Sequence, residues 1–295
     1  LLQRADVAMY VAKQEHAGAT AYAPELDVNS PRRLALLADL RHAIDERALS
    51  LHYQPKVELA SGEVRGVEAL VRWNHPELGP IPPIEFVPLA ESTALIHPLT
   101  TFVLETALRQ QREWHDRGYD LSMAVNLSAR SLLDVALPLQ ISALLTAHGV
   151  EPARLVLEIT ESTLMTDPAR ALRVLDALDA LGVRISIDDF GTGYSSLARL
   201  KDLPVHELKI DRAFVTSMQT IHSDAVIVRS TIDLARNLGL AVVAEGVEDR
   251  NVLNELGDLG CDAAQGYYLS RPVPPAELLV WLDEQQQPER QAPAA

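Results

Sequence analysis

The chain has 295 residues, 47% of them hydrophobic, and a formal net charge of -15. This length suits one α/β barrel, which usually runs to roughly 250 residues, and the acidic balance argues against broad non-specific binding to nucleic acid or to an anionic membrane surface. The single cysteine, Cys261, excludes a disulfide framework within the chain and fits a reducing compartment. We expect Cys261 to pack as a small buried apolar side chain.

The N-terminal segment indicates that this chain is a piece of a longer protein. The sequence begins with Leu1, shows no signal peptide and has no apolar run near the roughly 18 residues of a spanning helix. Residues 5–13, Ala-Asp-Val-Ala-Met-Tyr-Val-Ala-Lys, predict an amphipathic helix and resemble the last helix of a GGDEF (diguanylate cyclase) domain. The Gly-Gly-Asp-Glu-Phe signature is absent, so residues 1–30 are interpreted as the remnant of an upstream GGDEF-like domain plus a linker, without cyclase activity. We expect a cytoplasmic domain whose full-length protein carries sensors, or a membrane anchor, upstream.

Residues 31–284 predict one barrel domain, because strand-like and helix-like runs alternate along them. The expected strands are 51–57, 66–71, 121–127, 155–159, 184–187, 207–210, 241–244 and 264–268. The expected helices are 32–48, 101–117, 137–148, 168–181, 223–238, 251–259 and 275–284. Only a short turn at Ser61-Gly62 separates the first two strands, so they form a hairpin. The prediction is a modified TIM-type (β/α)8 barrel with one antiparallel strand, followed by a disordered tail at 285–295.

Two adjacent carboxylates, Asp188 and Asp189, end the short buried strand 184–187. An unpaired buried charge is very costly, so these side chains need a cation, a basic side chain or hydrogen-bond donors. Other polar residues lie in or just after neighbouring strands: Glu68, Asn126, Glu158, Lys209, Asp211, Glu245, Glu248 and Gln265. In a barrel these strand ends meet at one rim, where such enzymes carry their chemistry. The alternative is a set of unrelated caps and salt bridges.

Carboxylates gathered at one rim would repel one another, and Lys209 alone offsets little of that repulsion. Two divalent cations would remove it. Oxygen ligands without cysteine or motif-spaced histidine favour Mg²⁺ or Mn²⁺ over Zn²⁺. Two such ions about 3.5–4 Å apart suit the hydrolysis of a phosphate ester.

Seven ordered motifs resemble those of EAL domains, the cyclic di-GMP phosphodiesterases, over about residues 32–283. The motifs are Glu-Ala-Leu-Val-Arg-Trp at 68–73, Asn-Leu-Ser at 126–128, Glu-Ile-Thr-Glu at 158–161, Asp-Asp-Phe-Gly-Thr-Gly-Tyr-Ser-Ser-Leu at 188–197, Lys-Ile-Asp-Arg at 209–212, Ala-Glu-Gly-Val-Glu at 244–248 and Gln-Gly-Tyr at 265–267. A lone Glu-Ala-Leu carries no weight, whereas the ordered set is specific.

The resemblance implies a role for each matched residue. The implied ligands of two Mg²⁺ or Mn²⁺ ions are Glu68, Asn126, Glu158 and Asp188 for the first and Asp188, Asp189 and Glu245 for the second. The implied catalytic residues are Asp189, Lys209, which would orient the attacking water, and Glu245, the general base. The implied substrate contacts are Gln54, Arg72 and Gln265. The implied supporting residues are Glu161 and Asp211, which would hold the segment 189–196, and Glu248, with Gln265 counted among them as well.

The resemblance also implies hydrolysis of cyclic di-GMP to linear pGpG through two-metal activation of water. A catalytically inactive cyclic di-GMP receptor of the same fold is the alternative, and a barrel phosphodiesterase acting on glycerol or nucleotide esters is a third. We further expect a homodimer, because the family often dimerises near the Asp188 loop. No direct binding of this chain to a membrane or to polymeric nucleic acid is expected.

Overall fold

The computed structural model describes residues 31–161, 163–191 and 200–286. The expected GGDEF-like remnant at 1–30 and all but two residues of the expected tail lie outside this range. No helix in the described part of the chain is long and apolar enough to cross a membrane.

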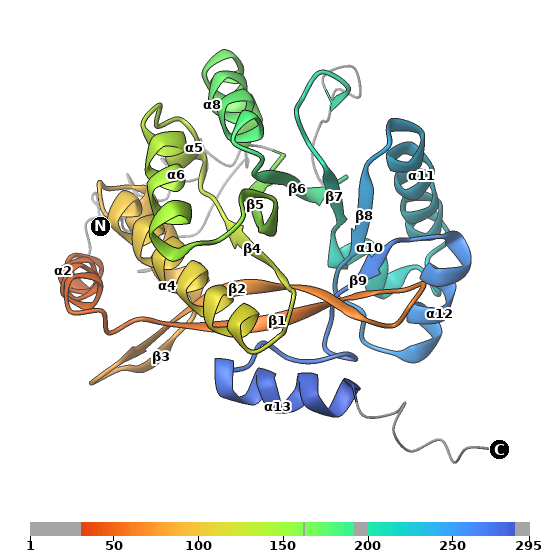
Figure 1. Ribbon diagram of the computed structural model, residues 1–295, viewed down its shortest axis with the longest axis horizontal. Helices are drawn as coiled ribbons and strands as arrows, with labels where there is room; N and C mark the ends of the chain where they lie inside the picture. The colour runs from red at the N-terminus through yellow and green to blue at the C-terminus, as the bar shows by residue number, and fades with distance from the viewer. Residues whose placement is uncertain (1–30, 162, 192–199, 287–295) are drawn as a thin grey trace, which may run out of the picture.

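Eight strands of the described chain close into a barrel (Figure 1). They are β1 (Ser50–Glu58), β2 (Val64–His75), β4 (Ser122–Asn126), β5 (Leu155–Thr160), β6 (Arg184–Phe190), β7 (Glu207–Ile210), β8 (Ala241–Ala244) and β9 (Ala263–Ala264). β1 runs antiparallel to both of its neighbours, β2 and β9, while β2 and β4 through β9 pair in parallel. A short strand, β3 (Gly79–Ile81), extends β2 outside the barrel. The predicted modified barrel with one antiparallel strand is confirmed.

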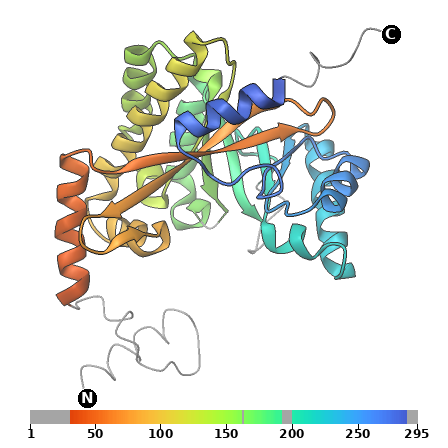
Figure 2. The same ribbon diagram turned by 90° about the horizontal axis from the view of Figure 1, so that it is seen from below.

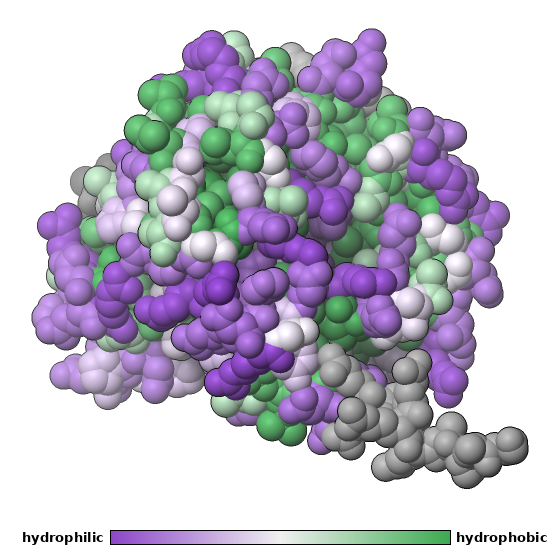
Figure 3. Space-filling model, viewed as in Figure 1, coloured by the Kyte–Doolittle hydropathy of each residue, from purple (hydrophilic) through white to green (hydrophobic). Residues whose placement is uncertain are grey.

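Helices surround the barrel, and some of them begin at a capping side chain. The helices are α2 (Pro31–Asp45), α3 (Pro83–Glu91), α4 (Ile96–Asp116), α5 (Ala129–Leu132), α6 (Leu137–His148), α7 (Thr163–Thr166), α8 (Pro168–Ala180), α10 (Arg212–Ser217), α11 (His222–Leu238), α12 (Arg250–Leu259) and α13 (Pro275–Gln286). Asp167 and Asp249 accept hydrogen bonds from backbone amides at the starts of α8 and α12. Figure 2 shows α13 lying across the β1–β2 hairpin, outside the ring of helices. Polar residues predominate on the face drawn in Figure 3.

The structure departs from the local predictions at the last strand and at several helices. The expected strand 264–268 pairs only at Ala263–Ala264, and the chain then turns away from the sheet. Residues 265–268 instead bond to the loop after β8: the Val247 amide donates to the Gln265 carbonyl, and the Tyr268 amide donates to the Val247 carbonyl. Gly266 comes so close that an added Cβ would lie 2.2 Å from the backbone nitrogen of Val247. Helices α3, α5, α7 and α10 were not among the expected helices, and α3 contains Pro88, a residue that normally breaks a helix.

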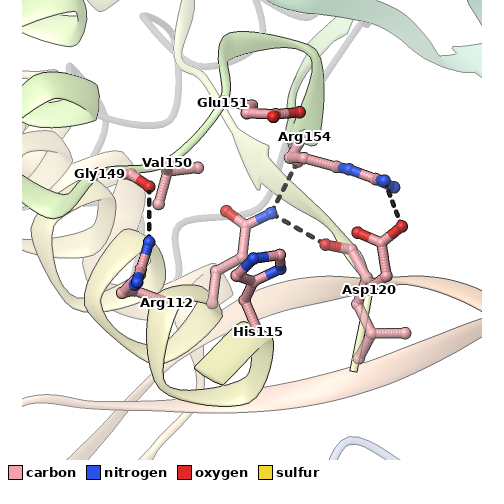
Figure 4. Close-up of a pocket in the computed structure, with 9 residues that line it drawn as sticks. Arg112, His115, Asp120, Gly149, Val150, Glu151 and Arg154 are labelled. Carbon is pink, nitrogen blue, oxygen red and sulfur yellow. Dashed lines mark hydrogen bonds and ion pairs between the residues drawn. The ribbon is translucent and has the colours of Figure 1, made fainter. Parts of the chain in front are cut away.

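The N-terminal ends of β4 and β5 are tied to α4. The buried Gln111 donates hydrogen bonds from Nε2 to the carbonyls of Leu121 and Arg154, at 2.9 and 3.1 Å (Figure 4). Arg112 and Arg154 are themselves paired, with the Gly149 carbonyl and the Asp120 carboxylate. A cavity of about 270 Å³ lies between these groups. It opens at the end of the strands opposite to the predicted rim of carboxylates.

Candidate active site

The buried side chain of Lys209 lies at the centre of the predicted rim. Its Nζ is 2.9 Å from Glu158 Oε2, 3.2 Å from Asp188 Oδ1 and 2.5 Å from Glu245 Oε1. Glu68 Oε2 lies slightly farther away, at 3.7 Å. These four carboxylates come from β5, β6, the residue after β8, and β2. The fold therefore brings residues from 68 to 245 together around one ammonium group.

A network of three carboxamides holds Glu68 in place. Asn126 Nδ2 donates to Glu68 Oε1 at 2.6 Å, and Gln265 Nε2 donates to Glu68 Oε2 at 2.6 Å. Gln265 Nε2 also donates to Gln54 Oε1 at 2.9 Å, and Gln54 Nε2 donates to the Ser270 carbonyl at 2.9 Å. Gln54 is the residue opposite Glu68 in the β1–β2 register. Gln265 thus positions Glu68, while contact of Gln54 and Gln265 with substrate stays a prediction.

A second buried lysine, Lys56, belongs to the cluster and was not predicted from the sequence. Lys56 Nζ lies 2.7 Å from Glu158 Oε1 and 3.4 Å from Glu207 Oε1. Both oxygens of Glu158 therefore face ammonium groups. Burial alone would raise the pKa of Glu158, but Lys209 and Lys56 outweigh it and lower that pKa to about 2. The available signal was a lysine inside a predicted buried strand, two residues from Gln54 and hence on the same face.

Three carboxylates lie close enough together to share a cation. One oxygen from each of Asp188, Asp189 and Glu245 lies within 4.8 Å of the others. Burial, Asp188 and Asp211 raise the pKa of Asp189 to about 6. Burial, together with Asp188 and Glu68, raises the pKa of Glu245 to about 8 despite its contact with Lys209. Both carboxyl groups therefore hold a proton more readily than usual, because neighbouring negative charges and burial disfavour their ionised forms.

The backbone also supports a special role for Asp189. Its φ of 54° places it in the left-handed region, which costs a non-glycine residue of order 1–3 kcal/mol. Its backbone amide donates to Asp188 Oδ1 at 3.0 Å. This conformation directs two adjacent carboxylates to one rim, which an extended strand would place on opposite faces.

The donor set fits divalent cations. Within the described residues, this cluster contains five carboxylates but only two ammonium groups. The ammonium groups belong to Lys56 and Lys209, and the carboxylates to Glu68, Glu158, Asp188, Asp189 and Glu245. The remaining negative charge and the oxygen ligands match Mg²⁺ or Mn²⁺. Assignment of each ligand to one of two ions stays a prediction.

The other predicted residues lie around this centre. Arg72 is on the same face of β2 as Glu68 and is partly buried, which lowers its pKa. Asp211 accepts from the Ala213 amide at 2.7 Å and so caps α10.

Glu161 is buried, and its Oε2 has no hydrogen-bond partner among the described residues. Glu248 is exposed and makes no hydrogen bond or ion pair within the described chain. The support of segment 189–196 by Glu161 and Asp211 stays a prediction, because residues 192–199 lie outside the described range.

The chain matches a known protein family over most of its length. The EAL domain model matches residues 37–272. MucR of Pseudomonas aeruginosa, a bifunctional diguanylate cyclase/cyclic di-GMP phosphodiesterase, is 48% identical over 281 residues, which are 95% of this chain and 41% of MucR. The cyclic di-GMP phosphodiesterase PdeR of Escherichia coli is 37% identical over 282 residues, which are 95% of this chain and 42% of PdeR. This chain thus spans about two fifths of the length of these curated relatives.

A solved structure shares the fold. The PaMucR phosphodiesterase, in a c-di-GMP complex, superposes with a TM-score of 0.80 at 49% identity, covering 83% of this chain and 99% of that chain. The family match, the relatives and the shared barrel lead to one conclusion. This chain belongs to the EAL domain family.

Proposed function

We propose that this chain is a metal-dependent phosphodiesterase that hydrolyses cyclic di-GMP to linear pGpG. The observation that carries the proposal is the convergence of Glu68, Glu158, Asp188 and Glu245 on Lys209, beside Asp189. Two relatives are named as cyclic di-GMP phosphodiesterases, and the solved MucR domain is described with c-di-GMP. These names support the substrate, and the geometry supports the chemistry.

Two Mg²⁺ or Mn²⁺ ions are the cofactors in this proposal. Glu68, Asn126, Glu158 and Asp188 would hold the first, and Asp188, Asp189 and Glu245 the second. When bound, such ions supply Lewis-acid stabilisation of phosphate charge and make water more acidic. Binding requires that Asp189 and Glu245 lose their protons, and it requires that Glu158 share its oxygens between lysines and an ion.

The protein's own groups then perform the proton and charge steps. Glu245, half-buried and with a raised pKa, would accept the proton of the attacking water. Lys209 stays positively charged, because Glu158 and Glu68 raise its pKa although burial opposes them. Its ammonium would orient the water and offset charge that develops on the phosphate. Arg72, with a guanidinium that is only partly buried, and Gln54 would contact the substrate.

The test is incubation of the purified chain with cyclic di-GMP and Mg²⁺ or Mn²⁺, followed by chromatographic separation of the products. We expect pGpG with either metal and none after chelation with EDTA. Tight binding of cyclic di-GMP that stays intact with both metals would instead identify an inactive receptor. Turnover of glycerol or nucleotide esters in place of cyclic di-GMP would identify the third alternative.

The wider assembly is also a proposal. We place a GGDEF-like domain and sensor domains upstream of residue 31 in the full-length protein, as the name of MucR suggests for that relative. We also propose that the chain forms a homodimer. Light scattering after size exclusion should give a mass near twice the 32.4 kDa of one chain, and a mass of one chain at micromolar concentration would exclude the dimer.

A further inference from the structure

The barrel interior contains a chain of ion pairs that the proposed chemistry does not use. Lys56 Nζ lies 2.7 Å from Glu158 Oε1 and 3.4 Å from Glu207 Oε1, so it joins a carboxylate of the rim to one at the start of β7. The side chains of Lys56 and Glu158 are almost fully covered, and that of Glu207 is 15% exposed. Water competes little for contacts buried this deeply, so the protein itself sets the orientation of Glu158.

The register of β1 shows that Lys56 approaches Glu158 from inside the barrel. Gln54 is the partner of Glu68, which belongs to the rim. Lys56 is the partner of Gly66, which lies two residues before Glu68 on the parallel strand β2. Side chains two residues apart on a strand share a face, so Lys56 lies one layer deeper than Gln54. Its ammonium group therefore holds Oε1 of Glu158 from below, while Oε2 contacts the ammonium group at the centre of the rim.

The contact of Lys56 with Glu158 is chiefly directional. Burial lowers the pKa of Lys56, but Glu158 and Glu207 outweigh burial and raise it, so the ammonium group stays charged. The Glu207 carboxylate, 3.4 Å away, offsets much of that positive charge. What remains at Glu158 is a short charge-assisted hydrogen bond to one particular oxygen, Oε1.

The divalent cations differ in how many oxygens they take from a carboxylate. Ca²⁺ accepts about six to eight oxygen ligands and often binds both oxygens of one carboxylate, whereas Mg²⁺ requires a smaller, nearly octahedral site. Mn²⁺ also suits octahedral oxygen sites. A glutamate whose Oε1 is held by an ammonium group offers one oxygen to an ion. Glu158 thus meets the need of the smaller ions and withholds the second oxygen that Ca²⁺ uses.

Resting on the metal site of the proposed function, we infer that Lys56 is a positioning residue that leaves Glu158 one free oxygen and so favours Mg²⁺ or Mn²⁺ over Ca²⁺. Loss of its ammonium group frees Oε1, and a larger ion can then take both oxygens of Glu158. The same loss removes one positive charge, which strengthens the binding of every divalent ion alike. The ratio of two affinities therefore isolates the effect on Glu158.

The test measures the Kd of Mn²⁺ and the Kd of Ca²⁺ by calorimetry, without substrate, for wild type and three variants. Lys56→Met should lower the ratio of the Ca²⁺ value to the Mn²⁺ value about 10- to 100-fold, the scale on which partners of metal-binding side chains change metal affinity. Glu207→Gln changes the charge of the same network by one unit but keeps the contact of Lys56 with Glu158, so its ratio should equal that of wild type. Lys201→Met, at an exposed position, controls for the loss of a lysine. An unchanged ratio in Lys56→Met, or an equal shift in Glu207→Gln, would overturn the inference.

A second measurement needs no variant, and so it decides the matter even where Lys56→Met does not fold. Crystals of wild type grown with Mn²⁺ or with Ca²⁺ should show Glu158 bound to the ion through Oε2 alone, with Lys56 still on Oε1. Both oxygens of Glu158 on a Ca²⁺ ion would overturn the inference.

These measurements also separate the inference from the proposed function, because neither of them needs cyclic di-GMP or turnover. A wild type that binds Mn²⁺ but does not hydrolyse cyclic di-GMP refutes the proposed function, while a shifted ratio in Lys56→Met still supports the role of Lys56. Hydrolysis by wild type together with an unchanged ratio in Lys56→Met refutes the role of Lys56 alone.

Discussion

Replacing Lys56 by methionine removes one of the two buried lysines described in the barrel interior while nearly keeping the side-chain volume. The side chain of Lys56 is only 7% exposed and that of Glu158 is fully covered. Without Lys56, Glu158 Oε1 loses its 2.7 Å partner, and Glu207 loses a partner at 3.4 Å. Lys209 still contacts the other oxygen of Glu158, at 2.9 Å. The variant therefore weakens a buried charge network without abolishing it.

The magnitude follows from the pKa of Glu158. Its fall from 4.5 to about 2 corresponds to about 3 kcal/mol of stabilisation of the carboxylate, produced by Lys209 and Lys56 against the opposing effect of burial. Breaking a buried pair costs about 3–5 kcal/mol when the remaining charge is uncompensated. Because Lys209 remains, we expect a loss near the lower value, about 3 kcal/mol. At about 2–4 °C per kcal/mol, the melting temperature should fall by about 6–12 °C.

The assay is thermal and urea unfolding of the metal-free protein in EDTA, with Lys201→Met, at an exposed position, as the matched control. A pKa below 4.5 means that the Glu158 carboxylate stabilises the fold above that pH and that this stabilisation disappears as the pH falls toward about 2. The difference between wild type and Lys56→Met should therefore shrink over this pH range. A Lys56→Met variant as stable as the Lys201→Met control at pH 7 would refute the reasoning.

Three other changes test the site and the fold. Asp188→Asn should reduce turnover of cyclic di-GMP at least about 10²–10³-fold while keeping the circular dichroism of wild type, and loss of the folded spectrum would show a structural role instead. Because the pKa of Glu245 is raised to about 8, its proton is held below that pH and lost above it. The affinity for Mn²⁺ should then rise between about pH 6 and 8, and binding should release protons. Calorimetry in two buffers measures both quantities, and an Mn²⁺ affinity that does not change with pH would contradict this prediction. Gly266→Ala should destabilise the fold by more than about 1 kcal/mol in urea, because its Cβ would lie 2.2 Å from the Val247 backbone; unchanged stability would show that this loop yields freely.

Several features of the fold and site followed from the sequence because they depend on local pattern. Alternating strand and helix runs predicted a barrel, and the short Ser61-Gly62 turn predicted the antiparallel strand, both of which the structure has. Polar residues at successive strand ends predicted one rim, since parallel strands in a barrel place these ends together. The contacts of Lys209 with Glu68, Glu158, Asp188 and Glu245 agree with that expectation.

Only the tertiary structure decided which charges pair and which remain free. Lys56 and Glu207 lie on different strands, and no local pattern shows that Lys56 reaches Glu158 across the barrel interior. The turn of the chain after β9 likewise involves a close approach between segments apart in the chain, at Gly266 and Val247. Periodicity encodes which face of a strand or helix is buried, whereas pairing and cavity shape arise only when those faces meet.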